Sequence, residues 1–543
     1  MASELAIILN ILAIIISITY LILHRLRLSL LHQNVETEPV SIEALNLAQK
    51  LATTLPNSVI LPQNAEDFKK GLKAYWAEQE SEVIPACIVR PRTVQELSTA
   101  IKIFKREYDD RENGQDANKG PYGGIFAVRG GGHSPVPGAA SIKGGAQVDL
   151  RYLNSVTPSE DGKSVVIGGG ARWMDVSRVL DERGLAVAGG RNAEVGVGGF
   201  TLGGGLSYFT HRFGLVCSNV ISYEVVLADG SITTASADNN RDLWKALKGG
   251  SNNFGVVTKF TLKSFPCGKI WGGLNYYPAF QATKLLAAFH ETIDKMDSDD
   301  FSHGAGLIIT FSYLPRYNLQ ILGANLASTA LPENPKKWPN CWQATPFSSL
   351  WRYWSTCKVQ TVTSATWEMA NLNMGGRRQT FGSTTILNDP ATVSAAHRIY
   401  TEAFSSLRSV NPKGMAFSII FQPFLASWAR KGDENPLGLR DTTESLVIVS
   451  FAVNWDKRAD DEFVKSTVHL TLEKIEAFAA ANKTSHRFRY LNYCNEWQKP
   501  FESYGEENWQ FLKDVSRKYD PEGLFQRGCV GGFKLDIEKR ARD

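Results

Sequence analysis

A glycine-rich segment holds the first residues whose types and spacing could do chemistry. Residues 129–134 read RGGGHS, so His133 follows three glycines and comes shortly before Pro135 and Pro137. Glycine lets backbone N–H groups approach a ligand without interference from a side chain, and successive N–H groups form a concavity that holds anions. The segment leaves two possibilities open for His133. It either hydrogen-bonds backbone groups of its own loop or faces a bound molecule.

Two further glycine clusters follow in the same part of the chain. They read VGVGGFTLGGG at 195–205 and KGGSNNFG at 248–255. One cluster is weak evidence because tight turns have the same composition, but three within about 130 residues favour a dinucleotide or another diphosphate. None has the GxGxxG pattern of a nicotinamide site between a strand and a helix, and no GxxxxGK[ST] phosphate loop is present. The sequence therefore argues against a nucleotide triphosphatase.

Strand and helix patterns surround the first glycine cluster. Residues 86–90 form a short apolar run that predicts a buried strand. The next segment has apolar residues at helical spacing, with Thr93 and Glu96 placed as a capping box. Residues 124–130 predict a second strand that leads into the His133 loop. We interpret 81–268 as one mixed α+β unit.

Strand signals continue beyond these loops. Asp-Gly pairs at 161–162 and 229–230 lie between alternating apolar runs and predict two hairpins. Long alternating runs between 269 and 475 predict one antiparallel sheet with helices packed on it. Gln422 and Ser418 alternate along one such run, so both are candidates to face a pocket.

Composition bounds the class of protein. The chain has 543 residues, which is too long for one ordinary core. Its 43% hydrophobic and 21% charged residues are typical of a globular protein. The net charge of +4, without a basic stripe, does not support a nucleic-acid partner. The seven cysteines form no CxxC pair, which predicts neither a disulfide framework nor a metal site.

The N-terminal segment differs from the rest of the chain. Residues 5–23 are apolar and uncharged over 19 positions, and Arg25 and Arg27 follow them. This length suits a bilayer, and a cleaved signal peptide would carry its positive charge before the apolar run. We predict a single-pass membrane anchor over 1–30, then a linker and helical lead-in over 31–80. The positive flank places the remainder on the cytosolic side, with the endoplasmic reticulum as the expected membrane. The alternative is a cleaved signal and a secreted protein.

Several motifs together resemble one family. The segments PACIVRPRTVQELSTAI, RGGGHS, GVGGFTLGGG, VVLADG and GSNNFGVVTKF have the order and spacing of the FAD-linked oxidases of the vanillyl-alcohol oxidase superfamily, berberine-bridge-enzyme-like branch. The resemblance covers 81–268 and resumes at 489–525. It implies an α+β fold with a two-subdomain, PCMH-type FAD-binding domain (81–268), a substrate-binding domain on an antiparallel sheet covered by helices (269–475), and a C-terminal segment (476–543) that returns to the FAD domain.

The resemblance also implies roles for individual residues. His133 would be linked covalently to the 8α-methyl carbon of FAD, Asn492 would face the cofactor, and Tyr493 would face the substrate as general base. Many relatives have a second tether, a cysteine, where this chain has Asn192, so we expect a single histidyl linkage. A phenol is a poor base at neutral pH unless a cation or hydrogen bond stabilises the phenolate, and the sequence identifies no such partner. The other expected FAD-binding positions are Arg129, Gly130, Gly131, Gly132, Ser134, Gly198, Gly199, Gly203, Gly204 and Val257.

The expected activity follows from this resemblance. The protein would oxidise a small apolar organic molecule, within secondary-metabolite biosynthesis, by hydride transfer to FAD. Oxygen would then take the electrons and become hydrogen peroxide. Three alternatives remain open: a secreted carbohydrate oxidase, a redox-neutral flavin-dependent cyclase, and a flavin-binding protein without turnover.

Overall fold

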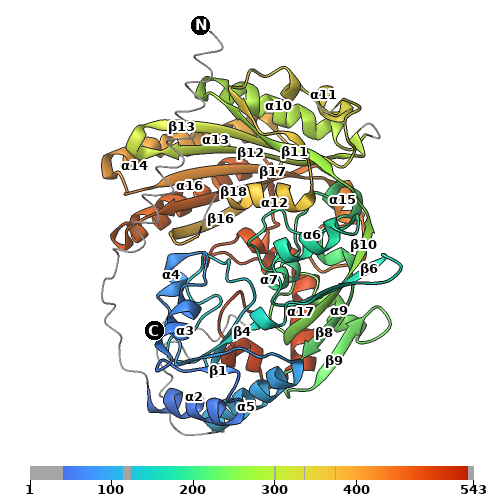
Figure 1. Cartoon of the computed structure of the whole chain (residues 1–543). Coiled ribbons are helices and arrows are strands. Elements are labelled where there is room, and N and C mark those ends of the chain that lie inside the picture. The colour runs from blue at the N-terminus through green and yellow to red at the C-terminus, as the bar shows by residue number, and fades with distance from the viewer. Residues whose placement is uncertain (1–40, 114–123, 299–300, 335–336, 373–374, 536–543) are drawn as a thin grey trace. The chain divides into compact units, whose positions relative to one another are not determined.

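Three β-sheets organise the part of the chain that the computed structural model describes (Figure 1). No helix within the described ranges is long and apolar enough to cross a membrane. The predicted anchor over 1–30 lies outside them. The structure describes residues 41–113, 124–298, 301–334, 337–372 and 375–535.

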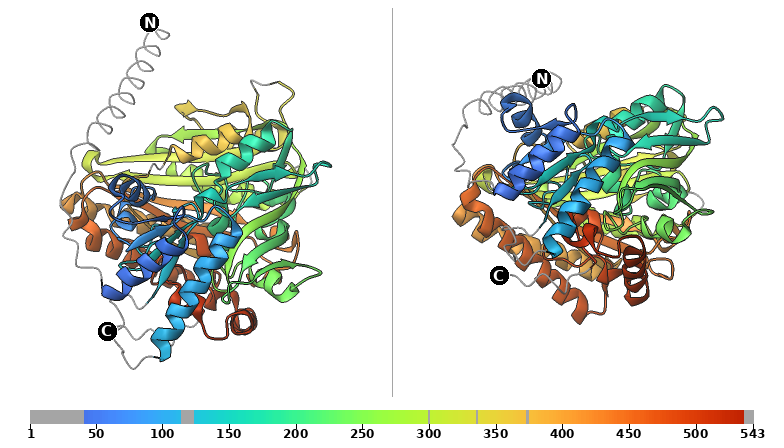
Figure 2. Two further views of the ribbon diagram at one scale, coloured as in Figure 1. Left: turned by 60° about the horizontal axis from the view of Figure 1, so that its bottom comes forward. Right: turned by 90° about the horizontal axis from the view of Figure 1, so that it is seen from below.

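The first sheet carries the His133 loop. It has the order β1-β2-β4-β3, with β2, β4 and β3 parallel and β1 antiparallel. The predicted strand, helix and second strand are confirmed. At the helix start, Glu96 N donates to Thr93 Oγ1 at 3.2 Å, while the Glu96 carboxylate accepts from Arg92 N at 2.6 Å. Figure 2 shows α2 beside α5. The elements are α2 (Ile42–Thr54), β1 (Val59–Ile60), α3 (Ala65–Leu72), α4 (Glu78–Ser81), β2 (Cys87–Val89), α5 (Val94–Asn113), β3 (Phe126–Arg129) and β4 (Ala146–Asp149).

The second sheet is antiparallel and has the order β5-β6-β10-β8-β9, with β7 on β10. Both predicted hairpins are confirmed, because β5 pairs with β6 and β8 with β9. Gly162 and Gly230 have φ of 68° and 80°, a backbone conformation that favours glycine. The elements are β5 (Val156–Pro158), β6 (Ser164–Gly168), α6 (Trp173–Asp181), β7 (Leu185–Val187), α7 (Val197–Leu202), α8 (Thr210–Phe213), β8 (Val220–Val226), β9 (Ile232–Ser236), α9 (Arg241–Ala246) and β10 (Val256–Pro266).

The third sheet is the predicted antiparallel sheet, in the order β14-β11-β13-β12-β17-β18-β16-β19, with β15 on β11. Helices α10, α13 and α16 pack beside one another on it (Figure 1). Its strands are β11 (Ile270–Tyr277), β12 (Gly304–Leu314), β13 (Leu319–Ser328), β14 (Trp354–Ser355), β15 (Lys358–Gln360), β16 (Arg378–Leu387), β17 (Ala416–Phe424), β18 (Leu446–Trp455) and β19 (Ser485–His486). Its helices are α10 (Ala282–Lys295), α11 (Asn340–Gln343), α12 (Val362–Ala370), α13 (Pro390–Glu402), α14 (Phe404–Val410), α15 (Ala426–Arg430) and α16 (Asp461–Ala481).

The alternation along β17 decides which side chains leave the helix-covered face. Phe417 stacks on Tyr400 of α13, and Phe421 meets Phe289 of α10. Because neighbouring side chains of a strand point to opposite faces, Ser418 and Gln422 point away from the helices. The open face of the sheet therefore presents both residues that the sequence suggested for a pocket.

The C-terminal segment contacts the first sheet and the loop that precedes β10. Val530 N donates to Phe126 O at 2.9 Å, next to a bridge between Phe126 and Cys529. Gln526 Nε2 donates to Asn253 O at 3.1 Å, within the third glycine cluster. Residues near the C-terminus thus contact both the strand before the His133 loop and the third glycine cluster. The segment contains α17 (Glu506–Tyr519).

Candidate active site

Three loops that contain Gly131, Gly169 and Gly196 pack backbone against backbone. A Cβ atom at Gly131 would overlap the backbone of Gly196, and one at Gly196 would overlap Gly131. A Cβ at Gly198 would lie 2.9 Å from Gly169 O, which is also too close. Part of the glycine pattern therefore serves close packing of backbone on backbone. Gly199 is different, because a Cβ there would meet nothing within 4 Å, so the described residues leave open space beside it.

His133 follows β3 and is held within the protein. Its Nε2 atom is buried and has no hydrogen-bond partner among the described residues. Burial, and then the positive charge of Arg172, lowers the pKa of His133 to about 3. The imidazole is therefore neutral at physiological pH. Its ring stacks on Trp76, with centroids 4.4 Å apart and planes 10° apart.

The neighbours of His133 in the RGGGHS segment have structural contacts. The Arg129 guanidinium pairs with Asp149 at 2.6 Å and donates to Gly71 O at 2.8 Å. Burial alone would raise the pKa of Asp149, but Arg129 and Arg151 outweigh it and hold that pKa below its usual range. Ser134 Oγ accepts from the backbone N of residue 136 at 3.3 Å. The side chains of Arg129 and Ser134 are thus used locally.

The C-terminal motif reaches the second glycine cluster. Asn492 Nδ2 donates to Phe200 O and to Tyr490 Oη, each at 3.0 Å. A Cβ at Gly203 would overlap the Asn492 side chain, whereas one at Gly204 would lie 3.4 Å from its nearest neighbour. The structure thus brings Asn492 and Gly203 into contact. Val257 lies beside another of the packed glycines, because its carbonyl oxygen faces the backbone of Gly169.

Tyr493 has a cationic partner that the sequence did not reveal. Arg191 Nη2 donates to Tyr493 Oη at 3.2 Å and to Gln422 Oε1 at 2.7 Å. Arg191 is 8% exposed, and no carboxylate bonds to its guanidinium within the described part of the chain. A guanidinium that donates to a phenol oxygen stabilises negative charge on that oxygen. The only hint in the sequence was position, because Arg191 directly precedes Asn192.

A row of aromatic rings joins the histidine end of the site to the tyrosine end. Trp76, which stacks on His133, lies 5.3 Å from Phe381 between ring centroids, and Phe381 lies 6.1 Å from Tyr493. Tyr490 meets Tyr493 edge-on at 4.8 Å. Trp76 and Tyr490 in this row are buried, whereas Phe381 and Tyr493 are partly exposed. The reactive candidates from the first half, the open sheet face and the C-terminal segment thus belong to one site.

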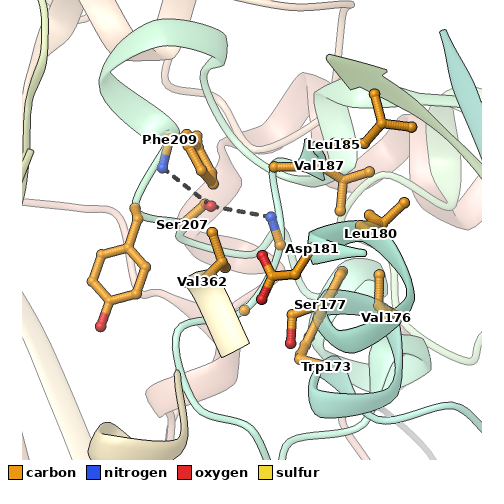
Figure 3. Close-up of a pocket in the computed structure, with 14 residues that line it drawn as sticks. Trp173, Val176, Ser177, Leu180, Asp181, Leu185, Val187, Ser207, Phe209 and Val362 are labelled. Atoms are coloured by element: carbon orange, nitrogen blue, oxygen red, sulfur yellow. Dashed lines mark hydrogen bonds between the residues drawn. The ribbon is translucent and has the colours of Figure 1, made fainter. Parts of the chain in front are cut away.

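Two pockets adjoin this region. One, of about 280 Å³, is bordered by Arg191 and Gln422 and also by His211, whose Nε2 is buried without a hydrogen-bond partner in the described ranges. The other, of about 350 Å³, lies beyond Trp173 and has mostly apolar walls (Figure 3). None of the predicted catalytic or FAD-binding residues lines the larger pocket. Ser418 lines neither, and its Oγ lies 2.8 Å from Ser312 Oγ.

Comparisons with known proteins agree with this arrangement. Residues 85–236 match the FAD binding domain family. The chain is 33% identical to the FAD-dependent monooxygenase tpcD of Cochliobolus heterostrophus, over 85% of this chain and 87% of that protein. It is 32% identical to the FAD-dependent monooxygenase sdcF of Emericella nidulans, over 90% and 97%.

Solved structures share the fold. 6-Hydroxy-D-nicotine oxidase from Arthrobacter nicotinovorans superposes with a TM-score of 0.69 at 20% identity, covering 92% of this chain and 99% of that one. A variant of berberine bridge enzyme gives a TM-score of 0.68 at 17% identity, covering 90% and 100%.

The fold and the site together define a flavin-dependent oxidoreductase. The chain belongs to the family of FAD-dependent oxidoreductases that includes the fungal FAD-dependent monooxygenases tpcD and sdcF, and it shares the fold of 6-hydroxy-D-nicotine oxidase and berberine bridge enzyme. FAD is its cofactor. The residues present fit this group, because open space adjoins Gly199 and the buried Nε2 of a neutral His133 lacks a partner within the described ranges.

Proposed function

We propose that this protein oxidises a small, largely apolar organic molecule in secondary-metabolite biosynthesis, with Tyr493 as general base. The observation that carries the proposal is the bond from Arg191 to Tyr493, at a site that also holds Gln422. It places a positive charge at the phenol oxygen, the atom on which a general base carries negative charge. The names of the relatives, FAD-dependent monooxygenases and bifunctional solanapyrone synthase, support a role in such pathways.

The roles of the chain's own residues follow from their placement. Tyr493 accepts the proton from an O–H or N–H of the substrate as the adjacent C–H gives up a hydride. Arg191 stabilises the charge on Tyr493 before transfer, and Gln422 orients the guanidinium through its 2.7 Å bond. Bound FAD would supply the two-electron oxidising chemistry, with oxygen as the final acceptor and hydrogen peroxide as its product. The substrate thus loses two electrons and two protons in total, as one hydride to the flavin and one proton to Tyr493.

His133 is the proposed covalent anchor of FAD. Because its pKa is lowered to about 3, its imidazole keeps a free lone pair for bond formation. Joining an imidazole nitrogen to the 8α carbon replaces an N–H and a C–H bond with one C–N bond. It releases two protons and two electrons, which oxygen accepts. The resemblance places Asn192 where many relatives carry a cysteine, and its Oδ1 accepts from Glu194 N at 2.9 Å, so we propose one linkage only.

The tether is tested by denaturation. Wild-type protein, unfolded and precipitated with acid, should keep its flavin in the pellet, and mass mapping should place the label on the His133 peptide. His133→Ala should release FAD to the supernatant while still folding. Flavin that stays in the pellet of His133→Ala would refute the assignment. Absence of flavin from folded wild-type protein would refute the whole proposal.

The base is tested by rapid kinetics. Tyr493→Phe should slow anaerobic reduction of the bound flavin, because its ring keeps the packing against Phe381 and loses only the hydroxyl. Flavin content should not change. Reduction as fast as in the wild type would remove Tyr493 from the mechanism.

A second candidate is insertion of oxygen into the substrate. It is favoured by the word monooxygenase in the names of several relatives. An oxidase releases one hydrogen peroxide for each substrate and places no atom of O₂ in the product. A monooxygenase transfers one labelled atom when the reaction is run under isotopically labelled oxygen. Product mass and peroxide yield, measured together, separate the two.

We also propose that residues 1–30 anchor the protein in the endoplasmic reticulum membrane, with the remainder in the cytosol. The uncharged stretch 5–23 and the two arginines after it support this proposal. The full chain should sediment with membranes after an alkaline wash and be digested by protease added to intact microsomes. A chain without 1–30 should stay in the supernatant. Protection from protease, or loss of 1–30 from the mature protein, would contradict the proposal.

A further inference from the structure

Residues 75–80, named here the histidine clamp, wrap the loop that carries His133. Trp76 N donates to the carbonyl of residue 132 at 2.9 Å, and Tyr75 Oη donates to the carbonyl of residue 140 at 3.1 Å. Gln79 Nε2 donates to the carbonyl of residue 135 at 2.9 Å. The Glu80 carboxylate accepts from the backbone N atoms of residues 138 and 140, each at 2.6 Å. The clamp thus fixes this loop on both sides of His133.

The other side of the clamp contacts β16 of the third sheet. Glu78 N donates to Arg377 O at 2.9 Å, and Gln379 N donates to Gln79 Oε1 at 3.2 Å. Trp76 meets the ring of Phe381 on the same strand. Movement of β16 relative to the first sheet would therefore disturb the His133 loop.

We propose that the histidine clamp positions the His133 imidazole for covalent attachment of FAD, with Trp76 as the positioning residue. The inference rests on the tether of the proposed function and adds the group that aims it. The clamp lies before the matched FAD binding domain at 85–236 and within the stretch interpreted from sequence as a linker and helical lead-in.

The stacking geometry supplies the physical reason. Planes 10° apart at 4.4 Å leave the imidazole little freedom to rotate out of its orientation. Trp76 is only 7% exposed, so it also keeps water away from that face of the ring. A ring held in one orientation and kept neutral loses less conformational freedom when its nitrogen forms a bond.

The test compares Trp76→Phe with Trp76→Leu in the full-length protein. Both side chains fill much of the space, but only phenylalanine keeps a flat ring against His133. Apoprotein made under flavin limitation is mixed with FAD, and the acid-stable flavin is followed with time. Trp76→Leu should incorporate flavin covalently at least tenfold more slowly, while Trp76→Phe should recover most of the wild-type rate. Trp351→Ala, at an exposed tryptophan, is the control and should match the wild type.

Two further readouts keep the outcomes distinct. Circular dichroism and FAD binding by fluorescence quenching, measured before attachment, should be the same in Trp76→Leu as in the wild type. Covalent incorporation at the wild-type rate in Trp76→Leu would overturn the clamp while leaving the tether intact. Equal slowing in Trp76→Phe and Trp76→Leu would also overturn it, because any change of bulk would then suffice. Wild-type protein without acid-stable flavin would instead refute the tether.

Discussion

Removal of the Arg191 charge should slow the chemistry without emptying the site. Arg191→Met keeps the length of the apolar stem but deletes the hydrogen bond to Tyr493 and the one to Gln422. A hydrogen bond to a charged group contributes about 1.5–3 kcal/mol. If that bond is stronger in the transition state, its loss slows flavin reduction by about 10- to 150-fold, since each 1.4 kcal/mol is about tenfold.

The assay separates binding from chemistry. Anaerobic stopped-flow mixing with a substrate found by peroxide release gives a limiting reduction rate and a dissociation constant. Arg191→Met should lower the limiting rate and change the dissociation constant little. Arg191→Lys keeps the charge but loses the planar fork, so it should fall between Arg191→Met and the wild type.

Stability should fall by about 1–3 kcal/mol, because Arg191→Met leaves the buried Gln422 Oε1 without its donor. Arg352→Met is the matched control. Its guanidinium is half-buried over the Trp338 ring, and among the described residues it makes no hydrogen bond to a residue of the site. A limiting rate in Arg191→Met equal to that of the control would refute the role of the cation.

Three other outcomes test the loops. Burial raises the pKa of Glu80 from 4.5 to about 7, so the folded state holds the proton more tightly than the unfolded state. The free energy of unfolding should therefore fall by at most about 3 kcal/mol as pH rises from about 4.5 to 7. Urea unfolding should show this pH dependence in the wild type and not in Glu80→Gln. Gly131→Ala should destabilise the apoprotein by about 1–3 kcal/mol, because its Cβ overlaps the backbone of Gly196. Gly199→Ala should leave the melting temperature of the apoprotein unchanged and weaken FAD binding, because its Cβ enters open space. Equal shifts of melting temperature in the two variants would contradict this difference. Asn192→Cys in the His133→Ala background should restore some acid-stable flavin, because it puts a thiol at the position where the resemblance implies a second tether. A pellet without flavin would show that the thiol does not reach.

Local signals explain why the elements were predictable from sequence. The two Asp-Gly turns specify hairpins through a positive φ at glycine, and that requirement does not depend on distant contacts. The alternation along β17 placed Gln422 and Ser418 on one face for the same reason. The structure then distinguished them, since Gln422 reaches Arg191 and Ser418 pairs with Ser312.

The contacts that complete the site are not local. Arg191 and Tyr493 are 302 positions apart, and neither spacing nor composition relates them. The clamp has no signal in the sequence for another reason. Three of its contacts with the His133 loop, made by Tyr75, Trp76 and Gln79, end on backbone carbonyls, which every sequence supplies and no motif records.

The division of the site among distant segments has a consequence for what each part can do. His133 and the packed glycine loops come from the first half of the chain, Gln422 from the third sheet, and Tyr493 from the C-terminal segment. Arg191 lies in the matched FAD binding domain at 85–236 and bonds to both Gln422 and Tyr493. In the proposed mechanism, a flavin held by His133 alone would lack both the base and the group that orients its cation. The proposal therefore makes retention of the cofactor and turnover separable properties, and it places Arg191 on the side of turnover.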